Sequence, residues 1–353
     1  MPVADIAHSI AEPAIGEPPS VVTPAFFTPA EVPPGPPRLF VVVDTEEAFD
    51  WSAPFSRDAV DVTAIDDVHR LQAVVEPLQI VPTYVVDYPV ASTQRSAETL
   101  VEIVHRGACQ VGAHLHPWVN PPHTEIVTAR NSFACNLGET LETQKIARLR
   151  DLITERFDVA PRAYKAGRYG FGSTTAAALE ALGFDVDLSV NPHWDFTGDG
   201  GPSFQGIGPR PSTFGLRRRL LEVPCTTGFI GAMRHVGPAV HRAASVRWLE
   251  PLRSLGVLAR SGALNRVMLS PEVSTFEEMQ ALTEALLADG VRTFSLTFHS
   301  PSLRPGCTPY VRTASERDAL VATIDRYCDD FLGRLGGVPG TPVGLFDELG
   351  HAA

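Results

Sequence analysis

Two histidines separated by one residue follow a short apolar run in GAHLHPW, residues 112–118. Alternate side chains of an extended strand point to the same face, so His114 and His116 are expected on one side of the chain. Neutral imidazole is the commonest protein ligand for zinc. The pair could therefore bind a metal ion, or both could be hydrogen-bonded loop histidines.

Carboxylates follow another apolar run. RLFVVV, residues 38–43, leads directly into DTEEAFDW, which contains Asp44, Glu46 and Glu47. Asp44 and Glu46 would share a face if the strand continued. Such a pair could hydrolyse glycosidic bonds, but that chemistry would leave the histidines without a task. Carboxylates and imidazoles together are ligands that a divalent metal ion prefers.

Two further polar groups lie at apolar runs later in the chain. FDVDLS contains Asp185 and Asp187, and SLTFHS ends a run with His299. The carboxyl ends of parallel strands meet at one edge of the sheet, where α/β folds assemble their sites. The sequence therefore predicts one site built from four distant segments.

The elements that must position these residues alternate along the chain. Short apolar runs, typical of buried strands, cover residues 38–43, 80–86, 109–116, 161–167, 184–190, 220–226, 265–272 and 291–300. Helical spacing covers residues 64–78, 96–107, 137–157, 172–183, 274–290 and 315–335, with Ser274 and Glu277 spaced as a capping box. The alternation predicts an α/β fold with a parallel sheet, open or closed into a barrel.

The texture of the sequence changes at Arg38. Residues 1–37 are rich in Pro, Ala and Glu, which predicts a flexible arm outside the fold. Residues 38–340 are expected to form a single catalytic domain, with a Gly-, Pro- and Arg-rich excursion at residues 196–219. Residues 341–353 are expected to be a C-terminal tail.

The composition argues against several partners. A formal net charge of −12 disfavours nucleic acids and anionic membranes, which need a basic surface. No apolar run reaches the roughly 18 residues that span a bilayer, and the first residues lack the pattern of a secretory signal. A cytoplasmic protein is therefore expected. Five widely spaced cysteines without a C-x-x-C predict reduced thiols.

The order of these motifs resembles the polysaccharide deacetylases of carbohydrate esterase family 4, the NodB-homology fold, and most closely their divergent WalW-like branch. In that family an acidic motif follows the first strand and a histidine motif the third, before an arginine motif, an aspartate–aromatic motif and a late Leu–His motif. The resemblance covers about residues 38–335. It implies a distorted parallel (β/α) barrel, a carbohydrate substrate and a divalent metal ion, with zinc as the expected one.

The resemblance also implies roles for the first two motifs. Asp44 takes the place of the catalytic aspartate and Glu46 that of the metal-binding one, with Glu47 as a competitor because the family's pair is adjacent. Trp118 stands where the family has its second histidine, so His114 and His116 are the implied ligands. His123, in the following loop, is expected to be a surface histidine.

The later motifs complete the implied site. YKAGRYG has Lys165 in the place of the family's arginine and Arg168 three residues on. Either could pair with Asp44 and hold it ionised, and the permanently charged fork of Arg168 makes it the preferred partner. Asp187 is expected to orient a catalytic histidine, and His299 is the expected general acid.

The implied reaction is metal-assisted hydrolysis of an N-acetyl group on an amino sugar, with the oxyanion held by the ion and a backbone N–H near Tyr169. The side chains expected to contact the sugar are Trp51, Trp118, Tyr169 and Lys165. Two alternatives remain open. One is hydrolysis of cyclic amides on the same scaffold, and the other is a catalytically silent carbohydrate-binding protein.

Overall fold

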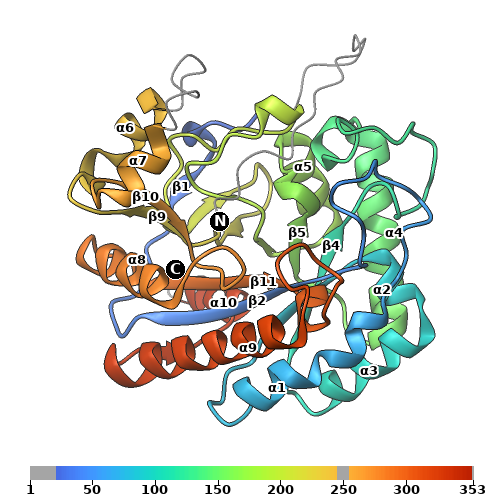
Figure 1. Ribbon diagram of the computed structural model, residues 1–353. Helices are drawn as coiled ribbons and strands as arrows, with labels where there is room; N and C mark the ends of the chain where they lie inside the picture. The colour runs from blue at the N-terminus through green and yellow to red at the C-terminus, as the bar shows by residue number, and fades with distance from the viewer. Residues whose placement is uncertain (1–20, 245–253, 352–353) are drawn as a thin grey trace.

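A curved, mostly parallel sheet forms the centre of the computed structural model, which describes residues 21–244 and 254–351 (Figure 1). Seven strands run parallel in the order β8-β6-β5-β4-β3-β2-β11. They are β2 Arg38–Thr45, β3 Thr83–Val86, β4 Gln110–Leu115, β5 Ala163–Ala166, β6 Val186–Asp187, β8 Leu220–Glu222 and β11 Thr293–His299. The curled sheet is a half-barrel, so the prediction of a distorted parallel (β/α) barrel is confirmed.

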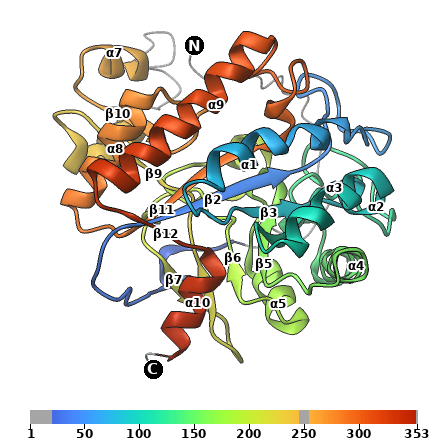
Figure 2. The ribbon, with the colours of Figure 1, turned by 90° about the horizontal axis from the view of Figure 1, so that it is seen from below.

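Helices cover the outside of this sheet (Figure 2). They are α1 His69–Val75, α2 Tyr88–Ser92, α3 Gln94–His105, α4 Glu139–Phe157, α5 Ser173–Leu182, α8 Phe276–Ala288 and α9 Ala314–Asp329. Neighbours pack in two series, α8–α9–α1 and α3–α4–α5. Among the described residues, no helix is long and apolar enough to cross a membrane.

The capping box of α8 lies one residue later than predicted. Thr275 accepts a hydrogen bond from the backbone N–H of Glu278, whose carboxylate accepts one from the backbone of Thr275. Ser274 instead donates to the carbonyl of Met268 at 2.8 Å. Because that contact comes from the preceding strand, the local spacing of Ser274 and Glu277 could not reveal it.

An antiparallel ribbon lies where the half-barrel is open. β9 Thr227–Ile230 pairs with β10 Asn265–Met268 outside the main sheet, so the expected strand at residues 265–272 does not join the parallel set. Leu269, directly after β10, accepts a hydrogen bond from the backbone of Thr297 in β11 at 3.1 Å. The ribbon carries α6 Gly237–Ala244 and α7 Ser254–Arg260 on its outer side (Figure 1).

Part of the predicted N-terminal arm belongs to the fold. β1 Thr28–Pro29 pairs antiparallel with β7 Ser212–Phe214, which lies in the excursion at residues 196–219 and joins β8. Val22 is buried. The prediction that residues 1–37 lie outside the fold is therefore wrong for residues 21–37, and residues 1–20 lie outside the described residues.

Two adjacent aromatic rings explain this docking. The Phe27 ring lies 6.2 Å from that of Phe171 and 6.0 Å from that of Phe214, and Phe26 contacts the same two rings. Burying such rings removes apolar area from water, which offsets the entropy lost on ordering a Pro-rich segment. The Pro-rich composition of residues 1–37 gave no indication that Phe26 and Phe27 would pack against the fold.

The predicted C-terminal tail is a helix. α10 Pro342–His351 follows the short strand β12 Val338–Pro339, which pairs with β2. Three side chains of α10 are buried in a cluster with the inner face of the sheet: Val343, Leu345 and Leu349. Phe40 and Val42 of β2 belong to that cluster, and they point to the same face of the sheet as Asp44 because every second residue of a strand shares a face. The helix α10 therefore covers the face that carries Asp44, below the carboxyl ends of the strands.

Phe27→Ala tests the docking of the N-terminal segment. The lost burial of the ring should lower the free energy of unfolding by about 2 kcal/mol, measured by urea denaturation. Val21→Ala is the matched control, because Val21 is exposed, and it should change stability by less than about 0.5 kcal/mol. Equal stability of the two variants would contradict the packing described here.

Candidate active site

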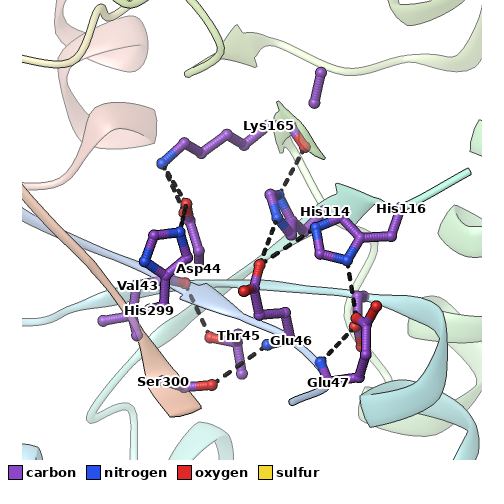
Figure 3. A network of polar contacts seen from close by, with 12 residues as sticks. Val43, Asp44, Thr45, Glu46, Glu47, His114, His116, Lys165, His299 and Ser300 are labelled. Atoms are coloured by element: carbon purple, nitrogen blue, oxygen red, sulfur yellow. Dashed lines mark hydrogen bonds and ion pairs between the residues drawn. The ribbon is translucent and has the colours of Figure 1, made fainter. Parts of the chain in front are cut away.

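Strand register brings the predicted polar residues to one edge of the sheet (Figure 3). Asp44 at the end of β2 is paired across the ladder with His299 at the end of β11. His114 in β4 is paired with Lys165 in β5. Glu46, two residues after Asp44, lies between these pairs and contacts His114. Residues from four separate strands therefore share one site.

Three buried side chains converge on a single point. Glu46 Oε2 lies 3.2 Å from Nε2 of His114 and 3.3 Å from Nε2 of His116. All three side chains are only 3% exposed, and their ligand-type atoms lie within 4.8 Å of one another. Carboxylate oxygen and imidazole nitrogen are ligands of divalent transition metals. This group could hold a metal ion.

The other nitrogen of each imidazole supports that possibility. Nδ1 of His114 lies 3.0 Å from the carbonyl oxygen of Lys165, and Nδ1 of His116 lies 2.8 Å from Glu47 Oε2. If each Nδ1 carries the proton that such acceptors require, both Nε2 atoms direct lone pairs at Glu46. Electron-pair donors that face one another without a proton fit a cation between them.

Glu46 and Glu47 differ in their surroundings, although they are adjacent. Burial alone would raise the pKa of Glu46, but the nearby charge of His299 helps to hold it below its ordinary range. Burial raises the pKa of Glu47 to about 8. Of the two, Glu46 alone contacts both Nε2 atoms, so it is the better placed ligand.

Glu47 instead supports His116 from behind. Its Oε1 accepts a hydrogen bond from the indole Nε1 of Trp118 at 3.0 Å, and its backbone N–H donates to Asp87 at 2.8 Å. Glu47, Asp87 and His116 also form a second buried group, whose ligand-type atoms lie within 4.8 Å of one another. Because the Glu47 oxygens already bind Trp118 and Nδ1 of His116, a role in orienting the imidazole is favoured.

The partner of Asp44 is Lys165 and not the preferred Arg168. Lys165 Nζ donates to both carboxylate oxygens at 2.7 Å and to Thr297 Oγ1 at 3.1 Å. Burial alone would lower the pKa of Lys165, but the charge of Asp44 raises it above the ordinary value. A charged ammonium therefore faces the carboxylate inside the protein.

Arg168 points elsewhere because the strand has ended before it. Its φ of +54° is left-handed, and its guanidinium donates to Ser132 Oγ at 2.6 Å and lies 4.1 Å from the centre of the Phe133 ring. Lys165 is still within β5, so strand geometry directs its side chain. Gly167, between them, allows His116 to approach, since a Cβ there would lie 2.3 Å from the imidazole.

The carboxylate that orients His299 is Glu272, which the sequence analysis missed. Nδ1 of His299 lies 2.8 Å from Glu272 Oε2, and Nε2 lies 3.8 Å from Asp44 Oδ2. Burial alone would lower the pKa of His299, but the charges of Glu272 and Glu46 raise it to about 10. Glu272 ends the expected strand at residues 265–272, so the criterion used for the other residues could have found it.

Asp187, expected to orient a catalytic histidine, has other partners. Its carboxylate accepts hydrogen bonds from the backbone N–H and the hydroxyl of Ser189 at 3.0 and 2.7 Å. Burial raises its pKa, beside the equally buried Glu222. The expected contact with a histidine is wrong, because the hydrogen bonds of the Asp187 carboxylate in the described structure go to Ser189, two residues on.

The predicted sugar contacts divide into two groups. Trp118 is 1% exposed and its ring is stacked on that of His116, with centres 4.3 Å apart, and Lys165 is equally buried. The prediction that these two side chains contact a sugar is therefore wrong, because neither is open to one. Trp51 and Tyr169 are half-buried. Trp51 lies edge-on to His299, with ring centres 5.2 Å apart, and the Tyr169 ring lies 5.7 Å from Lys165 Nζ. Of the four predicted sugar contacts, these two therefore keep exposed surface beside the site. His123 is exposed, as predicted.

Comparisons with known proteins identify the fold. No protein-family model and no curated protein matches the chain. A Mycobacterium smegmatis structure assigned to the polysaccharide deacetylases matches with a TM-score of 0.56 and 14% identity, covering 92% of this chain and 94% of that one. One from Pseudomonas aeruginosa PAO1, with the same assignment, matches with a TM-score of 0.52 and 14% identity, covering 89% and 91%. The chain has the NodB-type fold of the polysaccharide deacetylases.

Lys165→Met tests the buried ion pair. Leaving Asp44 charged and unpaired should lower the free energy of unfolding by about 3–5 kcal/mol, measured by urea denaturation. The double variant Asp44→Asn/Lys165→Met removes both charges and should recover most of that loss. If the double variant is as unstable as the single one, the loss reflects packing and not the charge of Asp44.

Proposed function

We propose that the protein is a metal-dependent hydrolase that removes N-acetyl groups from an amino-sugar-containing oligo- or polysaccharide. The observation that carries this proposal is the convergence of Glu46, His114 and His116 beside the Asp44–Lys165 ion pair. The NodB-type fold supports it, because the two structures compared above, among others that match, are named as polysaccharide deacetylases.

Glu46, His114 and His116 would hold the ion, and Glu47 and the Lys165 carbonyl would fix the two imidazoles. The mixed nitrogen and oxygen ligands suit zinc. When bound, a divalent ion supplies Lewis-acid chemistry, polarising the acetyl carbonyl and lowering the pKa of water.

Asp44 is the proposed general base. Lys165 Nζ fixes the carboxylate by donating to both of its oxygens, and it also donates to Thr297 Oγ1. The oxygen that faces His299, Oδ2, accepts the proton of the attacking water. As the water oxygen bonds to the acetyl carbon, negative charge develops on the carbonyl oxygen. The backbone N–H near Tyr169 is the proposed donor to that oxygen.

His299 is the proposed general acid. Its Nδ1 is tied to Glu272, so Nε2 is the nitrogen that faces Asp44 and the site. Nε2 donates its proton to the sugar nitrogen as the carbon–nitrogen bond breaks. The products are acetate and a free amine, and Trp51 and Tyr169 would flank the sugar.

Metal content and acetate release test the proposal together. Purified protein should contain about one zinc ion per chain, as expected for a site of histidine and carboxylate ligands. His114→Ala or His116→Ala should reduce the zinc content well below one per chain. His123→Ala is the matched control and should keep the ion. A chelator should abolish acetate release from N-acetylated oligosaccharides, and added zinc should restore it.

Two results would contradict that scheme. A His114→Ala/His116→Ala double variant that retains stoichiometric zinc would point to Glu47 and Asp87 as ligands. Metal-loaded protein that opens cyclic amides but releases no acetate would favour the other hydrolase reaction, and loaded protein inactive on both would favour a silent binding protein.

The pH profile tests His299. Because its pKa is raised to about 10, the acid is protonated at neutral pH, and activity should fall as the pH rises through that value. His299→Ala should lower kcat by roughly 10²–10⁴-fold, leave the zinc content unchanged and remove the alkaline limb. His105→Ala, at an exposed position, should retain the wild-type profile. Near-normal turnover of His299→Ala would exclude it as the acid.

A further inference from the structure

A half-buried arginine without a carboxylate partner lies on the antiparallel ribbon. The guanidinium carbon of Arg266 in β10 lies 3.8 Å from the centre of the Trp194 ring, and Nη1 donates to the carbonyl oxygen of His193 at 3.1 Å. No carboxylate in residues 21–244 or 254–351 forms an ion pair with it. Since arginine has five N–H donors, several remain open to a ligand.

The setting of Arg266 makes the absence of a carboxylate costly. Burial lowers its pKa to about 10, and a desolvated cation is stabilised only by a paired anion or by hydrogen bonds. Burial and the charge of Arg266 also lower the pKa of His193 and His241 to about 4, so both imidazoles are neutral. Arg162, which is also partly buried, in contrast forms ion pairs with Asp185 and Asp347.

Two buried polar atoms next to Arg266 also lack partners. Nδ1 of His193 and the indole Nε1 of Trp194 are buried without a hydrogen bond in the described structure. Such atoms are rare in folded proteins because each costs desolvation energy. His193 also has a φ of +66°, a left-handed conformation that is strained in a residue with a Cβ.

The surrounding loop holds this strained conformation in place. The backbone N–H of His193 donates to the carbonyl of Phe204 at 3.2 Å, and Phe204 donates back to Trp194 at 2.8 Å. Open donors, unpartnered polar atoms and a fixed, strained backbone occur together here. That combination is typical of a preformed ligand site.

A row of aromatic rings connects this loop with the candidate active site. The Tyr169 ring, beside Lys165, stacks on Phe196 with centres 5.3 Å apart and planes at 18°. Phe196 stacks on Trp194 at 5.8 Å and 9°, and Trp194 contacts Arg266. All three rings are half-buried. The row therefore offers an apolar path from the Asp44–Lys165 pair to the open guanidinium.

We propose that Arg266, with Trp194 and His193, binds a carboxylate carried by the glycan one or more sugar units away from the reacting acetyl group. The planar fork of a guanidinium matches the two oxygens of a carboxylate. The substrate is then an acidic N-acetylated glycan. This inference rests on the proposed hydrolase function and extends it to the class of substrate.

Calorimetry on the zinc-loaded full-length protein tests the subsite through binding. The probes are N-acetylglucosamine oligomers of one length, either uncharged or with a carboxylate or a phosphate on alternate sugars. Wild-type protein should bind the carboxylated oligomer about tenfold more tightly than the uncharged one, as expected for hydrogen bonds to a charged group. Arg266→Gln should remove this difference without weakening the uncharged oligomer.

Two further variants separate the charge and the fork from folding. Arg266→Lys keeps the charge but not the fork and should restore only part of the preference. Arg326→Gln is the matched control, because Arg326 also stacks on a ring, Phe276 at 3.6 Å, but pairs with Glu277 elsewhere on the surface. It should bind both oligomers like the wild type.

The outcomes distinguish this inference from the hydrolase proposal. Equal wild-type affinity for carboxylated and uncharged oligomers, or equal losses for both in Arg266→Gln, would overturn the subsite even if acetate is released. Tighter binding of the phosphorylated oligomer would overturn the carboxylate assignment. Arg266-dependent binding of the carboxylated oligomer without acetate release would support the subsite and reject the hydrolase.

Discussion

The ammonium of Lys165 donates to both oxygens of Asp44 at 2.7 Å in the interior, and the same residue's carbonyl oxygen receives Nδ1 of His114. Two charges taken out of water must remain together, because either one alone would be strongly destabilising. Their contact fixes the end of β5 against the end of β2. Lys165 therefore fixes two parts of the site: its side chain holds the candidate base Asp44, and its backbone carbonyl orients His114, one of the candidate metal ligands.

The inner face of the half-barrel is divided along the strands. Phe40 and Val42 of β2 pack with α10 in an apolar cluster, and the next inward position of the strand is Asp44. Glu46 follows just after the end of β2. Alternation of side chains makes this possible within a few residues. The apolar half supplies packing energy, so the polar half can tolerate buried ionisable groups held close together, namely Asp44, Glu46, Glu47, His114, His116 and Lys165.

Two further carboxylates, of Glu47 and Glu272, orient the histidines of the site. Glu47 links the indole of Trp118 to Nδ1 of His116, and Glu272 holds Nδ1 of His299. Trp118 stands at the position where the resembling family has a histidine, and here it acts on a candidate ligand through Glu47 and not as a ligand itself. An imidazole that donates to a carboxylate presents its other nitrogen in a fixed direction, which is what both metal binding and proton donation require.

Much of this site follows from local pattern. The apolar run before Asp44, the alternation that places Glu46 on the same face, and the ends of the strands at His114 and His299 can all be read from short segments of sequence, and with them the α/β class. Each depends only on strand geometry, which has a period of two residues and is set by the backbone.

Partner choice depended on the tertiary structure. Lys165 and Arg168 are three residues apart, yet only Lys165 lies within the strand that faces Asp44. Glu272, the packing of Phe27 and the return of α10 beneath β2 also join segments separated by many residues. Local patterns describe how a segment presents its side chains, but the distance between segments is decided by the packing of the whole chain, and ion pairs and hydrogen bonds depend on that distance within a few tenths of an ångström.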